Sequence, residues 1–150
     1  MLHFAYGSNL SSRFLRGHCP SAEFVMRATL PNFRVEFRFY SKSRKGGISS
    51  IVPYPSKLTR GVIYEVSEED MEKLDEVESV PDGFYVRERV LVLGEDEEYH
   101  KADLYRVVNP EGPFIPARSY VELMVEGAEE HGLDPEYVKN LRSLLASLKS

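Results

Sequence analysis

Alternating hydrophobic and polar positions predict several short strands in this chain. The clearest is the segment 33–39, in which four apolar residues alternate with arginine and glutamate; this is typical of a half-buried strand. A longer pattern from Phe84 to Leu93 is followed, across an acidic turn, by another from Tyr99 to Val108, and the two predict a β-hairpin. Shorter apolar runs predict further strands, at residues 2–6, 22–30, 48–52 and 61–66.

Prolines and polar residues mark the places where these strands are expected to end. Pro31-Asn32 is expected to turn the chain between two strands. Pro53 and Pro55 are expected to end the strand that begins at Ile48, because proline lacks the N–H that a strand ladder needs. The polar, glycine-containing segment 41–47 is expected to be a loop.

Apolar residues recur at helical spacing in several segments. A short helix is expected over the residues that follow Leu10, and a longer one begins at Ser67, a suitable N-cap, with acidic residues in its first turn and its end at Glu78. Two more helices are expected near the end of the chain. One runs from about Tyr120 to a C-cap near Gly132, and the other has Pro135 at its first position.

These elements predict one α+β domain that covers residues 1–150. The strands are interspersed with helices, two helices come last, and neither a repeat nor a linker divides the chain. Short strands joined by tight turns suit a closed or nearly closed barrel, so we expect a small mixed β-barrel with surrounding helices.

Composition narrows the class of protein. An apolar content of 42% and a charged content of 29% are typical of a globular chain, and the net charge of −5 argues against a nucleic-acid partner. No apolar run reaches membrane-spanning length, so no membrane association is expected. The single cysteine, Cys19, cannot form an internal disulfide, which favours a cytoplasmic location. Cys19 and the four histidines show no metal-ligand spacing, so we expect no metal site and interpret Cys19 as structural.

The stretch Tyr6-Gly7-Ser8-Asn9-Leu10 is the first candidate for chemistry. A predicted strand runs into it and a predicted helix follows, so unpaired backbone N–H groups gather there and could hold a carboxylate or a developing oxyanion. Gly7 lets the backbone approach a ligand closely, and Ser8 and Asn9 add side-chain hydrogen bonds. The alternative is an ordinary turn between a strand and a helix.

Glu78 is the candidate general acid or base. It follows the last apolar residue of its predicted helix, where negative charge opposes the helix dipole, and such a conflict is common at functional sites. The alternatives are that Glu78 is an exposed helix end, or that Glu88 has this role if its strand turns that side chain inward. The sequence contains no nucleophile-elbow serine and no phosphate-binding glycine motif, which leaves a carboxylate and backbone donors to act without metal or cofactor.

The chain resembles the gamma-glutamylcyclotransferase family, whose hallmark near the N-terminus is Tyr-Gly-Ser-Asn-Leu. The matching segments occur in order over nearly the whole chain. They are Tyr6-Gly7-Ser8-Asn9-Leu10, Cys19-Pro20-Ser21-Ala22, Lys45-Gly46-Gly47-Ile48, Gly61-Val62-Ile63-Tyr64, Leu74-Asp75-Glu76-Val77-Glu78, Gly83-Phe84-Tyr85-Val86 and Glu130-His131-Gly132-Leu133-Asp134-Pro135-Glu136-Tyr137.

The resemblance implies a site as well as a fold. It implies a small mixed barrel with a pocket beside the Tyr6 to Leu10 loop, whose backbone would hold a gamma-glutamyl group. It further implies that Glu78 is the acid/base and that Tyr85 and Tyr105 are pocket tyrosines. The family usually has a glycine after the catalytic glutamate. This chain has Ser79 there, so the geometry of that turn is in question.

The implied reaction needs no protein nucleophile. The alpha-amine of a gamma-glutamyl substrate attacks its own gamma-carbonyl, closes a five-membered lactam and releases 5-oxoproline with an amine or amino acid. One carboxylate with a raised pKa can take the proton from the attacking amine and give it to the leaving one.

Several alternatives stay open from the sequence. The leaving group could be an amino acid, the cysteinylglycine part of glutathione, a lysine side-chain amine or a biosynthetic intermediate, and we expect the loops at 41–45 and 109–116 to decide this. The protein could instead be a small-molecule binding or sensor module on the same fold. The apolar stripe of the last helix could close the core or form a homodimer interface.

Overall fold

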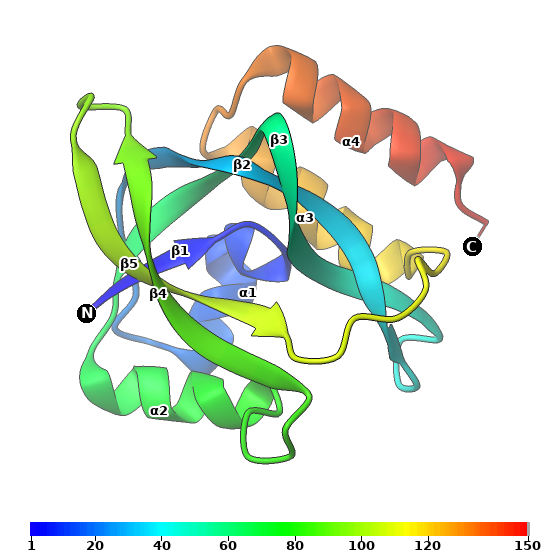
Figure 1. Ribbon diagram of the computed structural model, residues 1–150, viewed down its shortest axis with the longest axis horizontal. Helices are drawn as coiled ribbons and strands as arrows, with labels where there is room; N and C mark the ends of the chain where they lie inside the picture. The colour runs from blue at the N-terminus through cyan, green and yellow to red at the C-terminus, as the bar shows by residue number, and fades with distance from the viewer. Residues whose placement is uncertain (150) are drawn as a thin grey trace.

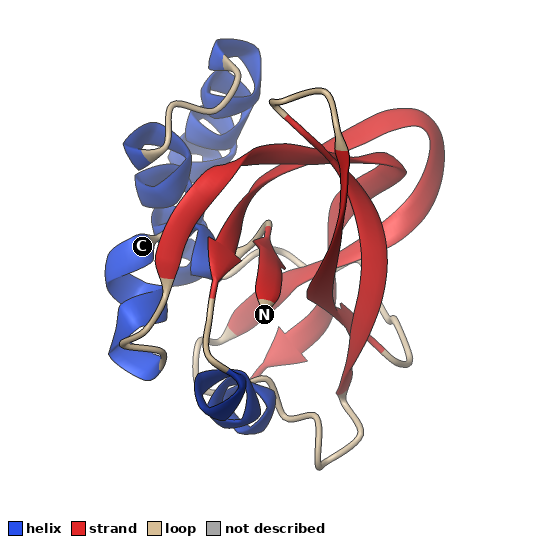
Figure 2. Ribbon diagram, turned by 90° about the vertical axis from the view of Figure 1, so that its left-hand side faces the viewer, coloured by secondary structure: helices blue, strands red, loops and turns tan. Residues whose placement is uncertain are grey.

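In a computed structural model that describes residues 1–149, five strands close into a barrel with helices on its outside (Figures 1 and 2). The strand order around the barrel is β1-β3-β2-β4-β5. The strands are β1 (Leu2–Ala5), β2 (Glu23–Ser41), β3 (Gly46–Glu65), β4 (Tyr85–Gly94) and β5 (Tyr99–Val107). The helices are the 3-10 turn η1 (Ser8–Leu10) and the α-helices α1 (Ser12–His18), α2 (Glu68–Val77), α3 (Arg118–Glu130) and α4 (Pro135–Ser147).

Strand β1 closes the barrel. It pairs antiparallel with the end of β3 from Leu2 to Ala5, and parallel with β5 through His3 and Asp103. Strands β4 and β5 form the predicted hairpin, in register from Tyr85 to Leu93. The expected α+β fold, a small mixed barrel with surrounding helices, is therefore confirmed.

The prediction that Pro31-Asn32 separates two strands is wrong. Strand β2 is continuous through this point, where its pairing with β3 shifts register between Pro31 and Phe33. Asn32 takes a left-handed φ of 66°, which asparagine tolerates better than most residues, and its side-chain oxygen accepts from the N–H of Ser56. The Pro-Asn pair therefore bends one long strand and does not end it.

Strand β3 likewise continues through the prolines that were expected to end it. Pro31 pairs with Leu58 and Phe33 with Pro53, so residues 54–57 of β3 have no paired partner in β2. A proline in such an irregularity removes no ladder hydrogen bond, which is why Pro55 is tolerated. The strand predicted at 61–66 is the last part of β3, paired with both β1 and β2.

The hydrophobic core has two parts. One is drawn almost entirely from the strands, including Phe4, Ile63 and Leu104, and fills the barrel. The other joins strand residues to the helices, with Leu15 of α1 and Met124 of α3 among its fully buried members. The turn after β1 lies where the two parts meet, because Tyr6 belongs to the first and Leu10 to the second.

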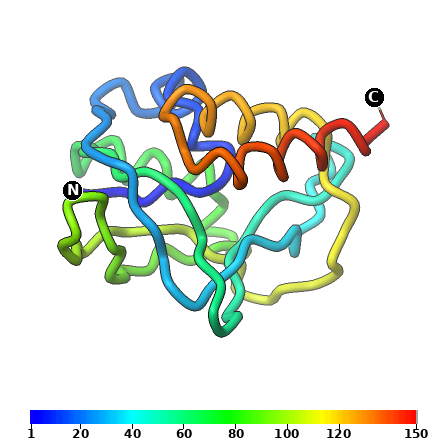
Figure 3. Tube along the Cα trace, turned by 90° about the horizontal axis from the view of Figure 1, so that it is seen from above, coloured from blue at the N-terminus to red at the C-terminus, as the bar shows by residue number. Residues whose placement is uncertain are grey.

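Polar caps fix the helix ends at the predicted residues. The Ser67 hydroxyl accepts from the N–H of Asp70 at the start of α2, and the Asp134 carboxylate accepts from the N–H of Tyr137 at the start of α4. Helices α3 and α4 pack on each other on one side of the barrel, and α2 lies on another (Figures 1 and 3). The apolar side of α4 packs against the core, and a homodimer stays a prediction. Within residues 1–149, no helix has the length and apolar character needed to cross a membrane.

Candidate functional site

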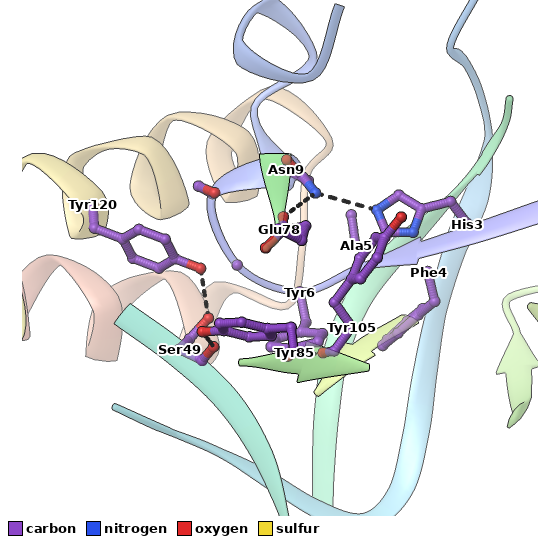
Figure 4. A pocket seen from close by; sticks show the side chains of 12 residues that line it. His3, Phe4, Ala5, Tyr6, Asn9, Ser49, Glu78, Tyr85, Tyr105 and Tyr120 are labelled. Carbon is purple, nitrogen blue, oxygen red and sulfur yellow. Dashed lines mark hydrogen bonds between the residues drawn. The ribbon is translucent and has the colours of Figure 1, made fainter. Parts of the chain in front are cut away.

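The turn after β1 and Glu78, at the C-terminal end of α2, line one small cavity (Figure 4). Strands β1, β3, β4 and β5 and helix α3 supply the rest of its wall. The lining residues are His3, Phe4, Ala5, Tyr6, Gly7, Ser8, Asn9, Ser49, Glu78, Tyr85, Tyr105 and Tyr120. The structure thus brings Glu78, the two pocket tyrosines and all but one residue of the Tyr6 to Leu10 stretch together. The exception is Leu10, whose side chain is buried in the core outside this cavity.

A single 3-10 turn shapes the N-terminal wall. The N–H of Leu10 donates to the Gly7 carbonyl at 3.0 Å, and the N–H of Ser11 donates to the Ser8 carbonyl at 3.2 Å. Helix α1 starts only afterwards, with Ser11 as its N-cap. The Asn9 side chain does not cap this helix and lines the cavity instead. The first N–H groups of such a turn have no partner inside it.

Position 7 requires glycine because there is no space for a side chain. Its φ of −112° is open to any residue, but a Cβ on Gly7 would lie 2.3 Å from the Tyr120 hydroxyl and 2.6 Å from the Ser49 hydroxyl. Those two hydroxyls are hydrogen-bonded to each other at 2.7 Å, so α3 and β3 are tied together directly against the turn.

Glu78 is the C-cap residue of α2, and the backbone after it sets the direction of its side chain. The N–H of Ser79 donates to the Glu76 carbonyl and that of Val80 to the Asp75 carbonyl, the pattern of a Schellman motif. Ser79 occupies the left-handed position of this motif with a φ of 57°. The turn that a glycine usually makes is therefore formed by a serine.

We expect Ser79→Gly to raise the free energy of unfolding by about 0.5–1 kcal/mol, because glycine adopts a positive φ without the Cβ clash that other residues meet. Chemical denaturation of the two proteins measures this difference. Ser79→Ala is the matched control, since it removes the hydroxyl and keeps the Cβ. A gain of the same size in Ser79→Ala would show that the hydroxyl, and not the backbone, is responsible.

The Glu78 carboxylate is poised for proton transfer near neutral pH. Burial in the cavity raises its pKa from the usual 4.5 to about 7, although the hydrogen bond from Asn9 and the charge of Arg44 act in the opposite direction. Asn9 Nδ2 donates to Glu78 Oε1 at 3.3 Å and so fixes the carboxylate against the turn (Figure 4).

This raised pKa predicts a pH-dependent stability effect for Glu78→Gln. Ionising Glu78 costs folding free energy only in the folded state, so the cost is absent below pH 4.5, grows as the pH rises to about 7 and is constant above that. The variant is therefore expected to be more stable than wild type at pH 8, by up to about 3 kcal/mol, and equally stable at pH 4. Thermal melts at the two pH values test this. An equal gain in stability at both pH values would show that the effect comes from packing and not from ionisation.

Asn9 also contacts His3, and this contact fixes the orientation of its amide. His3 Nδ1 lies 3.0 Å from the carbonyl oxygen of Asp103 and must carry the proton, so His3 Nε2 is an acceptor for Asn9 Nδ2 at 3.4 Å. Burial lowers the pKa of His3 to about 4, which keeps the ring neutral. Asn9 Nδ2 thus serves both His3 and Glu78, whereas Asn9 Oδ1 is buried without a hydrogen-bond partner in residues 1–149.

The tyrosines of the cavity are held by hydrogen bonds to the protein. Tyr6 donates to the carbonyl of Tyr105, Tyr85 donates to the carbonyl of Ser49 at 2.9 Å, and Tyr105 donates to the Asp75 carboxylate at 2.6 Å. Burial raises the pKa of Tyr6, Tyr85 and Tyr105 well above the usual phenol value, so they stay neutral. Glu78 is the lining group whose pKa lies near neutrality.

Two other candidates lie outside the cavity. Glu88 is partly exposed, with its carboxylate 2.6 Å from a guanidinium nitrogen of Arg106 on the neighbouring strand, so it does not compete with Glu78 for a role in the cavity. Cys19 is buried, donates to the carbonyl of Asp70 and has its pKa raised by burial to about 11, which makes it a structural residue.

Comparison with known proteins assigns the chain to a family. The profile of the AIG2-like family matches residues 59–141. Proteins named gamma-glutamylcyclotransferase from Bos taurus and Homo sapiens are 33% and 32% identical to it over 147 residues, which cover 95% of this chain and 78% of each relative. This chain belongs to the gamma-glutamylcyclotransferase family. A solved structure described as gamma-glutamyl cyclotransferase superposes with a TM-score of 0.90 at 31% identity, over 95% of this chain and 86% of that one.

Membership of the gamma-glutamylcyclotransferase family confirms that the chain is a cyclotransferase enzyme. It also accounts for the motif at Tyr6 to Leu10, since the ordered matches found in the sequence are matches to this family.

In this gamma-glutamylcyclotransferase homologue, a wider groove adjoins the small cavity. The two share Ser8, Glu78, Tyr85 and Tyr120, so Glu78 lies at their junction. The loop at 41–45 forms part of the groove wall, as expected. The segment 109–116 does not line the groove. Its members Asn109, Glu111 and Phe114 line an adjacent cavity that shares Phe39, Tyr40 and Phe84 with the groove.

His3, Ser49 and Tyr120 are the polar lining residues that sequence reasoning missed. Tyr120 reads as a member of the buried stripe of its helix, and Ser49 as an ordinary strand residue. The only local signal was the matched Lys45-Gly46-Gly47-Ile48 segment, which immediately precedes Ser49.

Proposed function

We propose that this protein converts a gamma-glutamyl compound into 5-oxoproline and a free amine or amino acid, with Glu78 as the general acid/base. The observation that carries the proposal is the Glu78 carboxylate, whose pKa of about 7 is unlike that of any other group lining the cavity. Family membership supports the same reaction.

The proposed step is balanced within the substrate. A bond forms between the alpha-nitrogen and the gamma-carbonyl carbon, and the bond from that carbon to the leaving nitrogen breaks. Two protons leave the attacking nitrogen, which is an ammonium group in the substrate and a single N–H in the lactam. The leaving nitrogen gains two and departs as an ammonium group, so no other reactant is consumed. Because the reaction is intramolecular, the enzyme has mainly to fold the substrate into the reactive conformation, and a small cavity suits that task.

Glu78 would carry the proton. Ionised, it takes a proton from the substrate's alpha-ammonium group; protonated, it gives that proton to the leaving nitrogen. A pKa near neutrality allows both transfers. Asn9 supports this assignment, because it holds the carboxylate through Nδ2. Its buried Oδ1 has no hydrogen-bond partner among the described residues, and an ammonium N–H would supply one.

The turn would bind the rest of the gamma-glutamyl group. Tyr6, Gly7, Ser8 and Asn9 line the cavity, and the N–H groups at the start of the 3-10 turn could donate hydrogen bonds to the alpha-carboxylate and to the developing oxyanion. One well-aimed oxyanion donor contributes about 3 kcal/mol. Leu10 would act indirectly, by anchoring the turn in the core.

Tyr85 and Tyr105 would form the wall opposite the turn. Both are buried, line the cavity and have their hydroxyls committed to protein acceptors, so they would bind the substrate's methylene groups with their rings. We assign them to substrate binding and not to proton transfer, since both phenols stay neutral.

The test is the release of 5-oxoproline from a panel of gamma-glutamyl compounds, measured by chromatography. The panel contains gamma-glutamyl-alanine, glutathione and gamma-glutamyl-lysine with the isopeptide linkage. We expect release from at least one member. Binding by calorimetry without any release would instead identify a binding or sensor module, and would overturn the proposal.

A further inference from the structure

The groove next to Glu78 is lined by more cationic than anionic side chains. The turn at 42–45 places two cations, Lys42 and Arg44, in its wall, whereas Glu78 is its one carboxylate among the described residues. The other wall residues are aromatic, aliphatic or serine side chains. The groove thus combines two cations with an apolar lining, and Glu78 lies at its junction with the small cavity.

Arg44 is held in place without being neutralised. Its guanidinium lies 5.5 Å from the centre of the Tyr120 ring and 5.6 Å from that of Phe14, and Nη1 donates to the hydroxyl of Ser119 at 3.0 Å. Within residues 1–149, no carboxylate lies within 4 Å of it, in contrast to Arg13 beside Glu126. Guanidinium is the side-chain group best matched to a carboxylate.

The apolar wall of the groove is exposed. Tyr40, Val77 and Phe84 are 48%, 46% and 49% exposed, although large apolar side chains are usually covered. Phe39, which packs against Phe84 at 5.3 Å between ring centres, extends the same wall. A patch of this kind at the mouth of a binding cavity marks a contact surface for a ligand.

We propose that Arg44 binds the alpha-carboxylate of a leaving amino acid, and that the Phe39 and Phe84 wall receives an apolar side chain on the same amino acid. This inference rests on the proposed function. If Glu78 protonates the leaving nitrogen at the junction of cavity and groove, the leaving group must lie in the groove. Its carboxylate carbon is two bonds from that nitrogen and needs a cation there to offset repulsion from Glu78.

The same charges disfavour a cationic leaving group. A polyamine would bring positive charge toward Lys42 and Arg44. Arg44 is therefore a residue that selects among gamma-glutamyl compounds, and it acts on the part of the substrate that differs between them.

The test compares gamma-glutamyl-phenylalanine with its C-terminal amide, in wild type and in Arg44→Gln. We expect wild type to prefer the acid in kcat/KM by about 10-fold or more, as for a hydrogen bond between charged groups. Arg44→Gln is expected to reduce this ratio to near 1, because the acid loses its cationic partner and the amide has no carboxylate to lose one. Arg60→Gln, an arginine in a cavity that shares no residue with the groove, is the control and should keep the wild-type ratio.

A second variant tests the apolar wall. Phe84→Ala changes an exposed side chain and should fold normally, and it is expected to reduce the preference for gamma-glutamyl-phenylalanine over gamma-glutamyl-glycine several-fold. An acid-to-amide ratio that is the same in wild type and Arg44→Gln would overturn the assignment of Arg44 and leave the cyclotransferase reaction intact. Calorimetry can measure the affinities of wild type and Arg44→Gln for the acid and for the amide. Because this comparison needs no turnover, it tests the role of Arg44 even if the proposed reaction does not occur.

Discussion

Glu78→Gln is expected to lower kcat for 5-oxoproline release by about 10²–10⁴-fold, the usual contribution of a positioned acid/base, while substrate affinity is retained. Glutamine is isosteric and can still accept the hydrogen bond from Asn9, so the cavity should keep its shape. It cannot carry the proton between the two nitrogens. Stopped assays give kcat, and calorimetry gives the affinity of the inactive variant.

Controls for this result are available on the same helix. Glu76→Gln alters an exposed carboxylate two residues earlier and should leave kcat unchanged. In wild type, kcat/KM should rise with pH through an apparent pKa near 7, because the free enzyme needs Glu78 ionised to take the ammonium proton. Equal activity of Glu78→Gln and wild type would remove Glu78 from the mechanism.

Gly7→Ala is expected to lower activity about 100-fold or more and to destabilise the fold by about 1–3 kcal/mol. The added methyl group would lie 2.3 Å from the Tyr120 hydroxyl and 2.6 Å from that of Ser49. To remove this steric clash, the hydrogen bond between the two hydroxyls must break or the turn must move away from Glu78. Thermal melts and the 5-oxoproline assay measure the two effects.

A double variant identifies the cause. Tyr120→Phe removes the hydroxyl that makes the closest contact, so Gly7→Ala should be less damaging in that background. Gly17→Ala is the control, because a Cβ there meets no atom within 4 Å. Additive losses in the double variant would contradict the steric explanation.

Much of the fold could be predicted from local patterns. The hairpin of β4 and β5 and the starts of α2 and α4 follow from alternation and from capping residues, which act over a few positions. The ends of β2 and β3 could not be predicted this way. Pro31 does not end its strand, because the pairing with β3, about 27 residues later in the chain, shifts register at this point. No local sequence pattern encodes that pairing.

The candidate site was predicted in a different manner. Periodicity alone left Glu78 as one of two carboxylates, and the motif at Tyr6 to Leu10 with its ordered matches made it the leading candidate. The motif could not indicate Ser49 or Tyr120, because these reach the cavity through packing of β3 and α3 against the turn. Cytoplasmic location and the extent of the domain stay predictions.

The seam where the barrel closes bears on how ligands affect the protein. Strands β1 and β5 meet at one paired position, His3 with Asp103, and the turn that follows β1 forms one wall of the cavity, with Tyr105 of β5 in another. A substrate bound there touches both sides of the seam. Binding of the ligand therefore stabilises the closed barrel. This stabilisation grows with the logarithm of the ligand concentration above Kd. Occupancy of the site and resistance of the N-terminal strand to local opening rise together.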